Sequence, residues 1–436
     1  MSGVPIVAQV AEIDTGDTAW MLAATALVLL MTPALGLFYA GLVRAKNTLN
    51  TFMMCVAAIA VALVTWAAFG YSFAFSEGNE LIGGFDYAFL SDVTLDPREG
   101  STIPHLLFFA FQATFCIITT ALISGAVVER MRFSAFLVFA ALWSLLVYSV
   151  LAHWAFGPGW LFNGGTLDFA GGVAVEMGSG FSALAAALVV GARKDYGRQA
   201  LLPHNSIYVL VGAGLLWFGW FGFNGGSGFN TGSNSVLAFT NTLLCPACAL
   251  LVWFLLDAVR RRRVTAVGAA TAIIVGCVGI TPAGGFVSPG YAMLLGALVA
   301  LPCYAVIAYR TRTRVDETLD VLAAHGVAGF TGILFIGFFA QMSWNGISDG
   351  LLYGNAAQLG DQALAAIAAP AYAFGATYVL LRAIGAVMPL RATEREEALG
   401  MDVVYHGEEA YPTGEGAILV STEAGVEEPV PVADAR

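Results

Sequence analysis

The stretch Leu319–Phe330, LDVLAAHGVAGF, carries a single histidine, His325, within a run of apolar and small residues. The run continues as TGILFIGFFAQ to Gln341. It is therefore long enough to cross a bilayer, which takes about 20 helical residues. An ionisable side chain at that depth costs about 3 kcal/mol or more and normally faces a cavity or a polar partner. We expect His325 to face the interior of a helical bundle.

A second stretch, Leu167–Gly178 (LDFAGGVAVEMG), begins with the same Leu-Asp pair and places Glu176 in another long apolar run. The two runs are the fifth and tenth of eleven, and they cross in opposite directions. This pattern is typical of an inverted five-plus-five repeat with a site at the midplane. At a rise of about 1.5 Å per residue, Glu176 and His325 each lie about 12 Å deep, from opposite faces. The sequence therefore predicts that they can meet near the middle.

The composition indicates that most of the chain lies in a membrane. Apolar residues make up 58% of the chain and charged residues 11%, with a mean hydropathy of +0.77; soluble proteins carry about 25% charge. The net charge is −11 and no basic cluster is interleaved with aromatics, so no nucleic-acid partner is expected. The six cysteines lie in apolar runs, and we interpret Cys245-Pro-Ala-Cys248 as packing, since it lacks a second pair or a nearby histidine.

The apolar runs predict an all-α integral membrane protein with eleven transmembrane helices, a five-plus-five inverted repeat followed by an eleventh helix. They are 18–43, 50–75, 104–128, 133–156, 169–192, 205–223, 235–258, 264–281, 289–309, 317–340 and 361–388. Basic residues follow the odd-numbered runs, and only Arg98 lies in a loop of the other side. The positive-inside rule therefore predicts an N-terminus outside and a C-terminus in the cytoplasm.

Three parts follow from these runs. Residues 1–17 form an extracytoplasmic N-terminus without an evident signal peptide, and residues 18–388 form the eleven-helix domain. Residues 389–436 form an acidic cytoplasmic tail, whose last twenty residues we expect to be mobile. The loop 77–101 holds six acidic residues, which either concentrate cations at the entrance or simply form a solvated surface.

Several motifs occur in one order along the chain: Gly41–Asn47, Phe111–Phe115, Glu129–Ser134, Asp168–Gly172, Trp220–Asn224, Thr281–Gly284, Asp320–Gly329, Gly400–Asp402, His406–Glu408 and Ala410–Tyr411. With these motifs the chain resembles the ammonium transporter family, in its Amt/Mep branch, over about residues 18 to 412. The resemblance implies a homotrimer with one hydrophobic pore per subunit, conducting ammonium or ammonia across the cell membrane. No nucleophile–base set, metal cluster or phosphate loop is seen, so we expect neither an enzyme nor a cofactor.

The resemblance also implies roles for individual residues. They are a gate of stacked aromatics (Phe115, Phe223), an outer recruitment site (Phe115, Phe156, Ser227, Asp168), a pore-lining aromatic (Trp220) and the second of two facing pore histidines (His325). Simpler interpretations stay open, because the two gate phenylalanines can be core packing. Asp168 can also act as a helix N-cap.

Two positions depart from the family pattern. The first pore histidine is replaced by Glu176, as in one fungal subset of the family. Where the recruitment site usually has a tryptophan, counting back from Asp168 reaches Phe156, with Trp154 and Trp160 close by. A phenyl face is a weaker cation–π partner than an indole. We therefore expect a lower external affinity, unless one of the two tryptophans takes the place.

Ammonium and potassium are close in size, so a pore cannot separate them by diameter alone. Ammonium differs from potassium in having four N–H donors and a removable proton. At the outer site, aromatic faces can attract the cation and a hydroxyl oxygen can accept a hydrogen bond from one of its N–H groups. A narrow apolar pore then makes a bare ion costly. Our hypothesis is that Glu176 and His325 titrate as one coupled pair in the conduction path. The alternative is a Glu176 carboxylate packed among helices with no role in the path.

Two other functions remain open at this point. One is an ammonium sensor with little net flux, and the other is a Rhesus-like channel for NH₃ gas. The segment Gly400–Tyr411 matches the family's cytoplasmic tail motif, which rests against neighbouring subunits and tunes activity. By resemblance, a PII-type signalling protein is a possible cytoplasmic partner.

Overall fold

The computed structural model describes residues 12–98 and 100–411. Within those residues the chain is helical and has no β-strand beyond three isolated bridges. The longer helices are α1 (Thr15–Leu42), α2 (Thr48–Thr65), α4 (His105–Val127), α5 (Phe133–Trp143), α8 (Gly178–Val190), α9 (Ser206–Gly226), α10 (Ser233–Arg261), α11 (Ala266–Ile280), α12 (Pro289–Arg310), α13 (Ala328–Phe339) and α15 (Ala356–Val387). Shorter helices are α3 (Tyr71–Phe75), α6 (Ser149–Ala155), α7 (Trp160–Asn163), α14 (Met342–Asn345), α16 (Glu394–Leu399) and α17 (Met401–His406).

Ten helical segments of the described chain are long and apolar enough to cross a membrane, and α11 is a shorter eleventh. The predicted all-α, eleven-helix membrane fold is therefore confirmed, and the protein is a multi-pass membrane protein. Two spans run through π-helical turns: η2 (Trp66–Gly70) joins α2 to α3, and η4 (Ser144–Tyr148) joins α5 to α6. Two further π-helical turns, η5 (Gly172–Met177) and η6 (Leu322–Val327), begin the fifth and tenth spans.

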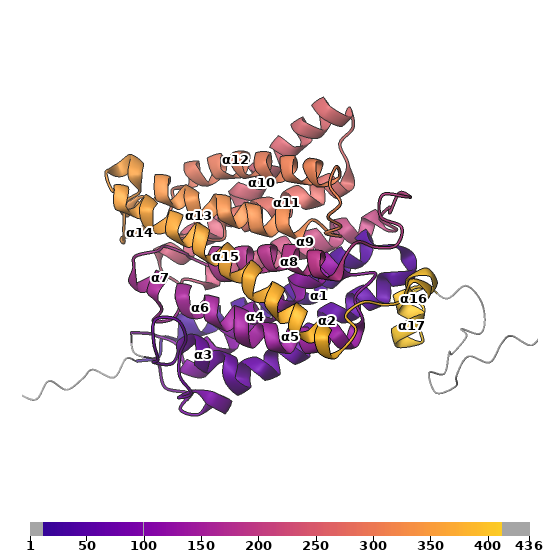
Figure 1. The fold of residues 1–436 in the computed structure, drawn as a ribbon. Helices are drawn as coiled ribbons and strands as arrows, with labels where there is room; N and C mark the ends of the chain where they lie inside the picture. Colours follow the sequence, from indigo (N-terminus) through magenta and orange to yellow (C-terminus); the bar gives the residue numbers. More distant parts are fainter. Residues whose placement is uncertain (1–11, 99, 412–436) are drawn as a thin grey trace, which may run out of the picture.

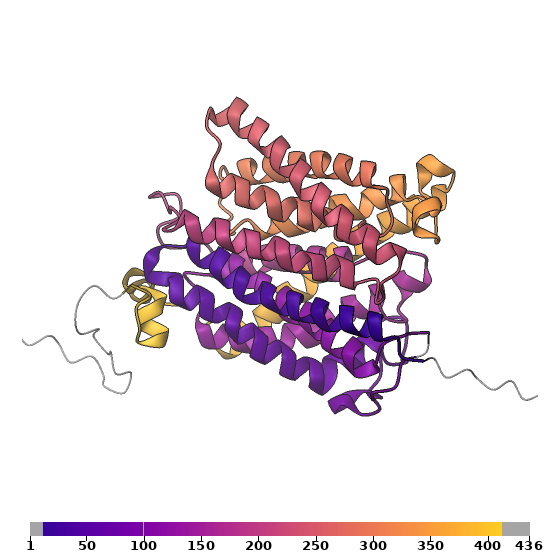
Figure 2. The ribbon, with the colours of Figure 1, turned by 180° about the vertical axis from the view of Figure 1, so that it is seen from behind.

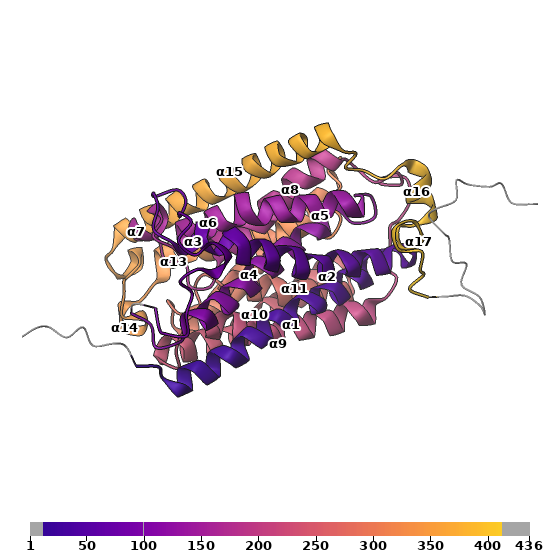
Figure 3. The same cartoon turned by 90° about the horizontal axis from the view of Figure 1, so that it is seen from below.

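The long helices run from one end of the molecule to the other (Figure 1). The short helices α3, α7 and α14 lie at one end, and α16 and α17 lie at the opposite end (Figure 3). Seen from behind, the indigo helix α1 lies on the face of the bundle, and its most extensive contacts are with α9 (Figure 2). Helix α15 crosses the bundle obliquely and packs on α8 and α13, so it bridges the two halves.

Buried charges tie the loops together at the end that carries α16. The Arg193 guanidinium donates to the carboxylates of Glu129 and Asp316, and Glu129 also accepts from Arg44. Burial alone would raise the pKa of Glu129, but the positive charges of Arg193 and Arg44 hold it below its usual value of 4.5. Breaking such a buried pair typically costs about 3–5 kcal/mol, so this network fixes the loops that follow α4 and α8.

The two last helices pack against the start of α2 in the same chain. Lys46 Nζ donates to the carbonyls of Glu397 and Ala398, at 2.8 and 2.6 Å. The Asp402 carboxylate accepts from the backbone N–H groups of Leu49 and Asn50, at 3.0 and 2.7 Å, and so caps that helix. The tail motif therefore contacts its own subunit, and the predicted mobile end falls outside the described residues.

Candidate functional site

The fifth span begins with a carboxylate cap. Asp168 Oδ1 accepts hydrogen bonds from the backbone N–H groups of Gly171 and Gly172, at 2.9 and 2.7 Å, and Oδ2 accepts from Val173 at 2.7 Å. The first N–H groups of a helix have no partner inside it. Asp168 thus accepts from the otherwise unpaired N–H groups at the start of η5. It acts as a helix N-cap, as one interpretation of the sequence proposed.

The tenth span begins in the same way, with Glu317 in place of Asp168. Glu317 accepts from the backbone N–H groups of Val321 and Leu322, four and five residues further on, at 2.9 and 3.2 Å. The corresponding N–H groups in the fifth span belong to the fourth and fifth residues after Asp168. Glu317 is therefore the structural counterpart of Asp168.

The hydrogen bonds of the two caps set the register of the repeat. Three residues after the caps, Gly171 and Asp320 both have positive φ angles, of 124° and 59°. Eight residues after the caps stand Glu176 and His325. Asp320 is therefore equivalent to Gly171, and the two Leu-Asp pairs lie three residues out of register with each other. The two Leu-Asp pairs indicated that a repeat exists, whereas the hydrogen bonds of Asp168 and Glu317 show which residues of the two halves are equivalent.

Glycines let the two half-repeats touch. A Cβ added at Gly180 would lie 2.2 Å from the backbone nitrogen of Gly326, and one added at Gly329 would lie 2.6 Å from Cβ of Glu176. Gly180 and Gly329 each stand twelve residues after their caps. The contacts are thus reciprocal, and each helix approaches the part of the other that carries Glu176 or His325. Small residues at such crossings are typical of packed membrane helices.

The structure brings Glu176 and His325 together at this crossing. His325 Nδ1 lies 2.7 Å from Glu176 Oε2, and both residues are buried, with exposed fractions of 4% and 1%. The other carboxylate oxygen of Glu176, Oε1, has no hydrogen-bond partner among the described residues. A buried acceptor without a partner is costly, so Oε1 is available to a proton, a water molecule or an N–H donor.

A small cavity lies beside this pair. It has a volume of about 20 Å³ and is lined by Glu176, His325, Trp220, Phe223 and otherwise apolar side chains. A volume of this size holds about one water molecule. The Trp220 ring is held in place, because its Nε1 donates to Thr281 Oγ1 at 2.9 Å. The cavity is therefore narrow and apolar except at the two titratable groups.

Two phenylalanines lie between this cavity and a larger pocket, which we call the outer pocket after the orientation predicted from the sequence. The ring centroids of Phe115 and Phe223 are 4.2 Å apart, with 36° between the planes, and both side chains are buried. Phe115 lines the outer pocket, whereas Phe223 lines the small cavity. The pair therefore lies between the two spaces.

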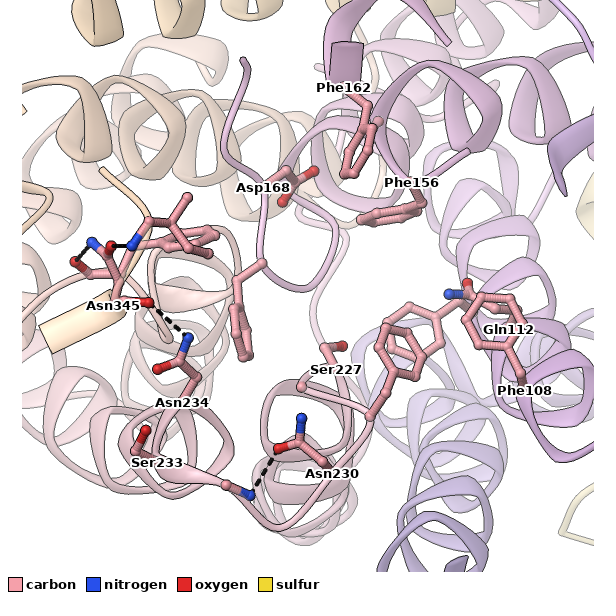
Figure 4. Close-up of a pocket in the computed structure, with 18 of the residues that line it drawn as sticks. Phe108, Gln112, Phe156, Phe162, Asp168, Ser227, Asn230, Ser233, Asn234 and Asn345 are labelled. Carbon is pink, nitrogen blue, oxygen red and sulfur yellow. Dashed lines mark hydrogen bonds between the residues drawn. The ribbon is translucent and has the colours of Figure 1, made fainter. Parts of the chain in front are cut away.

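The outer pocket has a volume of about 640 Å³. Figure 4 shows Phe156 and Asp168 on one side of the hollow, with Ser227 on the other. The Ser227 hydroxyl donates to the carbonyl of Phe223 at 2.8 Å, so its oxygen can accept from a ligand. Gln112 also lines the pocket, and its Oε1 is buried without a hydrogen-bond partner in the described chain.

The two tryptophans considered for the recruitment site do not line this pocket. Trp154 donates from Nε1 to the carbonyl of Leu81 at 2.9 Å, and its ring packs against Trp160 and Tyr372. The pocket keeps Phe156, so the outer site has a phenyl ring there. No group of three or more His, Cys, Asp or Glu side chains in the described residues is arranged to hold a metal ion.

Sequence reasoning missed Gln112 and Glu317. Gln112 lies within the Phe111–Phe115 motif, one helical turn before Phe115, and this spacing was a usable signal. Glu317 stands eight residues before His325, as Asp168 stands before Glu176, and this equal spacing could have been read from the sequence.

Comparisons with known proteins identify the family of this chain. The model of the Ammonium Transporter Family matches residues 19–411. An ammonium transporter of Bacillus subtilis is 44% identical over 399 residues, which cover 91% of this chain and 98% of that protein. The crystal structure of Candida albicans Mep2 has a TM-score of 0.84 at 35% identity, covering 88% of each chain. A structure described as a sensor Amt protein has a TM-score of 0.83 at 30% identity, covering 90% and 98%. The chain belongs to the ammonium transporter family.

Proposed function

We propose that the protein moves ammonium across the membrane through a pore in each subunit, from the outer pocket past Phe115 and Phe223 to the Glu176–His325 pair. The observation that carries the proposal is the 2.7 Å contact between Glu176 and His325 beside a small apolar cavity. Buried titratable groups inside a membrane protein are costly and typically mark an ion or proton path. Membership of the family supports ammonium as the substrate.

The outer pocket suits a cation with several N–H donors. Phe156 and Phe115 offer aromatic faces, whereas the Ser227 hydroxyl and the unpaired Gln112 oxygen offer acceptors. Asp168 lies in the pocket wall with its carboxylate engaged by three backbone N–H groups. It therefore contributes negative charge and a fixed wall, while the other groups make direct contact.

Below the aromatic pair, Glu176 and His325 act as one titrating unit. When Glu176 is ionised, it attracts a cation to the middle of the pore and favours a protonated His325. When it is neutral, it hydrogen-bonds to the imidazole. The pair either stabilises the ion directly or receives its proton, and Oε1 of Glu176 is the free acceptor for either step.

The proposal also covers the orientation of the chain in the membrane and its assembly. Residues 1–17 lie outside the cell, residues 18–388 form the transporter, and residues 389–436 form a cytoplasmic regulatory tail. The basic residues after the odd-numbered spans support this orientation, and the family resemblance supports a homotrimer in the cell membrane. The same resemblance, together with the docking of α16 and α17 at one end of the bundle, supports a PII-type partner on the cytoplasmic side.

The test is ammonium-evoked current in proteoliposomes, with potassium and methylammonium as comparators. We expect current with ammonium, less with methylammonium and little with potassium. Ammonium uptake without current would support the neutral-gas alternative. Absence of both would support the sensor alternative.

A further inference from the structure

His153 lies away from the pore, in the last turn of α6, and its side chain is fully buried. Its Nδ1 is 3.0 Å from the carbonyl oxygen of Ala74, and its Nε2 is 2.8 Å from the carbonyl oxygen of Asn79. A carbonyl oxygen only accepts, and a neutral imidazole has only one N–H donor. A neutral ring would therefore point one nitrogen lone pair at an oxygen lone pair. Only the doubly protonated ring donates to both carbonyls.

Two helix ends favour a positive charge at this place. Ala74 belongs to the last turn of α3, and His153 belongs to the last turn of α6. The C-terminal end of a helix carries partial negative charge and stabilises a histidine cation. Gly157 allows the two ends to approach, because a Cβ there would lie 2.1 Å from the carbonyl oxygen of Ala74. The burial of the charged ring is thus offset by two carbonyls and two helix ends.

The titratable groups around α6 make no hydrogen bond to His153 in the described residues. The segments that pack on α6 carry Tyr71 in α3, Tyr148 in η4, Glu176 in η5 and Tyr372 in α15, and the loop above it carries Glu77 and Glu80. Tyr71 bonds to His105, Glu176 to His325 and Tyr372 to the carbonyl of Leu146, whereas the Tyr148 hydroxyl is buried without a partner in the described residues and the two loop carboxylates are exposed. In the described chain no carboxylate oxygen lies within 4.0 Å of a His153 ring nitrogen, so the carbonyl contacts determine its state.

The same region holds the outer loop through three successive carbonyls. The carbonyl oxygen of Asn79 lies 2.8 Å from His153 Nε2. The carbonyl of Glu80 accepts from the backbone N–H of Trp160 at 3.1 Å, and that of Leu81 accepts from Trp154 Nε1 at 2.9 Å. The residue that follows α6 is Phe156, whose ring lines the outer pocket. The contacts of His153 therefore connect the outer loop to the helix end that positions this ring.

We propose that His153 is a proton-dependent positioning residue for the outer pocket. As a cation it clamps residues 79–81 and α3 to the end of α6, and this clamp holds Phe156 in the pocket wall. Loss of its proton removes one of the two hydrogen bonds and loosens the loop. The role in transport rests on the proposed function of the pocket, whereas the protonation state and the clamp do not.

The direct test is ¹⁵N NMR of the histidine rings in the full-length protein, from about pH 5 to about pH 8, where histidines titrate. The His153 signal is assigned by its loss in His153→Gln. We expect two protonated ring nitrogens at the acidic end of this range. A ring with a single protonated nitrogen throughout this range, in folded protein, would overturn the proposal.

Hydrogen exchange gives a second readout. The Gly83 amide donates to the carbonyl of Phe73 in α3, and the Gly84 amide donates to the carbonyl of Glu77. We expect the protection factors of both amides to fall about tenfold when the ring keeps only one N–H, because one hydrogen bond is worth about 1.4 kcal/mol. In His153→Gln they should be low at every pH, and in the control His204→Gln, at the other end of the molecule, they should follow the wild type. Equal protection in all three proteins would contradict the clamp.

Transport distinguishes this role from that of the pore pair. The apparent ammonium affinity should weaken about threefold or more in His153→Gln and lose its pH dependence, while the pH profile of the maximal current keeps its shape. A changed maximal-current profile with unchanged affinity would place His153 in the pore machinery and overturn the proposal. If no current is found with wild-type protein, the proposed function fails, and the NMR and exchange results still decide the clamp.

Discussion

The Glu176 carboxylate and the His325 imidazole, 149 residues apart in the sequence, share a hydrogen bond of 2.7 Å in the buried centre of the bundle. A proton on one of two groups this close changes the charge that the other group meets, and we propose that the charge state belongs to the pair. Each group is contributed by one of two half-repeats that meet through glycines. The pair therefore depends on packing as much as on its own chemistry.

Replacing Glu176 with glutamine should lower ammonium-evoked current at least about tenfold and remove the part of the pH profile due to the carboxylate. Glutamine keeps the shape and an acceptor for His325, but it cannot ionise; tenfold corresponds to about 1.4 kcal/mol. Current in proteoliposomes measures the effect, with Glu409→Gln in the exposed tail as a matched control. Unchanged current and pH profile would remove Glu176 from the path.

Replacing Phe156 with tryptophan should strengthen the apparent affinity for ammonium. An indole face binds cations more tightly than a phenyl face, and a gain of about 0.5–1 kcal/mol corresponds to about two- to fivefold. The concentration giving half-maximal current is the measurement. The control is Phe218→Trp, since Phe218 is 55% exposed on α9 and lies outside the pocket. Equal shifts in both variants would argue against a cation contact at Phe156.

Replacing Gly180 with alanine should destabilise the protein by about 1–3 kcal/mol and reduce transport, because the new methyl group meets the backbone of Gly326 at 2.2 Å. Gly375 in α15 has open space around it. Gly375→Ala should therefore be neutral or slightly stabilising, by up to about 1 kcal/mol. Thermal unfolding in detergent compares the two. Similar melting temperatures would show that the crossing can relax.

Replacing Glu317 with alanine should cost about 1–2 kcal/mol, as expected for loss of a helix cap, and should also lower the current because η6 carries His325. Glu317→Gln keeps one acceptor oxygen, so it should lose less of both. Thermal unfolding and current, measured on the same preparations, give the comparison. A Gln variant as impaired as the Ala variant would indicate that the charge of Glu317 matters rather than its cap.

Acid should weaken the loop network around Glu129. The folded-state pKa of this carboxyl is below 4.5, because the charges of Arg193 and Arg44 outweigh the effect of burial. Its contribution to stability is therefore complete above about pH 4.5 and is lost as the pH falls through the lower folded-state value. Melting temperatures from about pH 6 to about pH 3 should fall in the wild type and fall less in Glu129→Gln, which starts lower. Melting temperatures that fall equally with pH in the two proteins would show that Glu129 does not cause the acid sensitivity.

Much of this architecture could be predicted from the sequence, because membrane spans and their number follow from long apolar runs. The depth of Glu176 and His325 in their runs was also enough to expect them to lie close together. The register of the repeat was not predictable from the Leu-Asp letters, since Asp168 and Glu317 are matched by backbone hydrogen bonds. The spacing of Gln112 from Phe115 indicates the same helix face, but its unpaired oxygen is recognised only once the surrounding helices are in place.

The contact between Asp402 and Asn50 has a consequence for biosynthesis. The carboxylate that caps the start of α2 lies 352 residues later in the chain. When α2 first enters the membrane, the ribosome has not yet made Asp402, so the N–H groups of Leu49 and Asn50 must hydrogen-bond to water until this residue has been added. This helix end can therefore be capped only after the spans up to α15 have been made, and a ribosome that stops short of residue 402 releases a bundle in which the start of α2 has no cap.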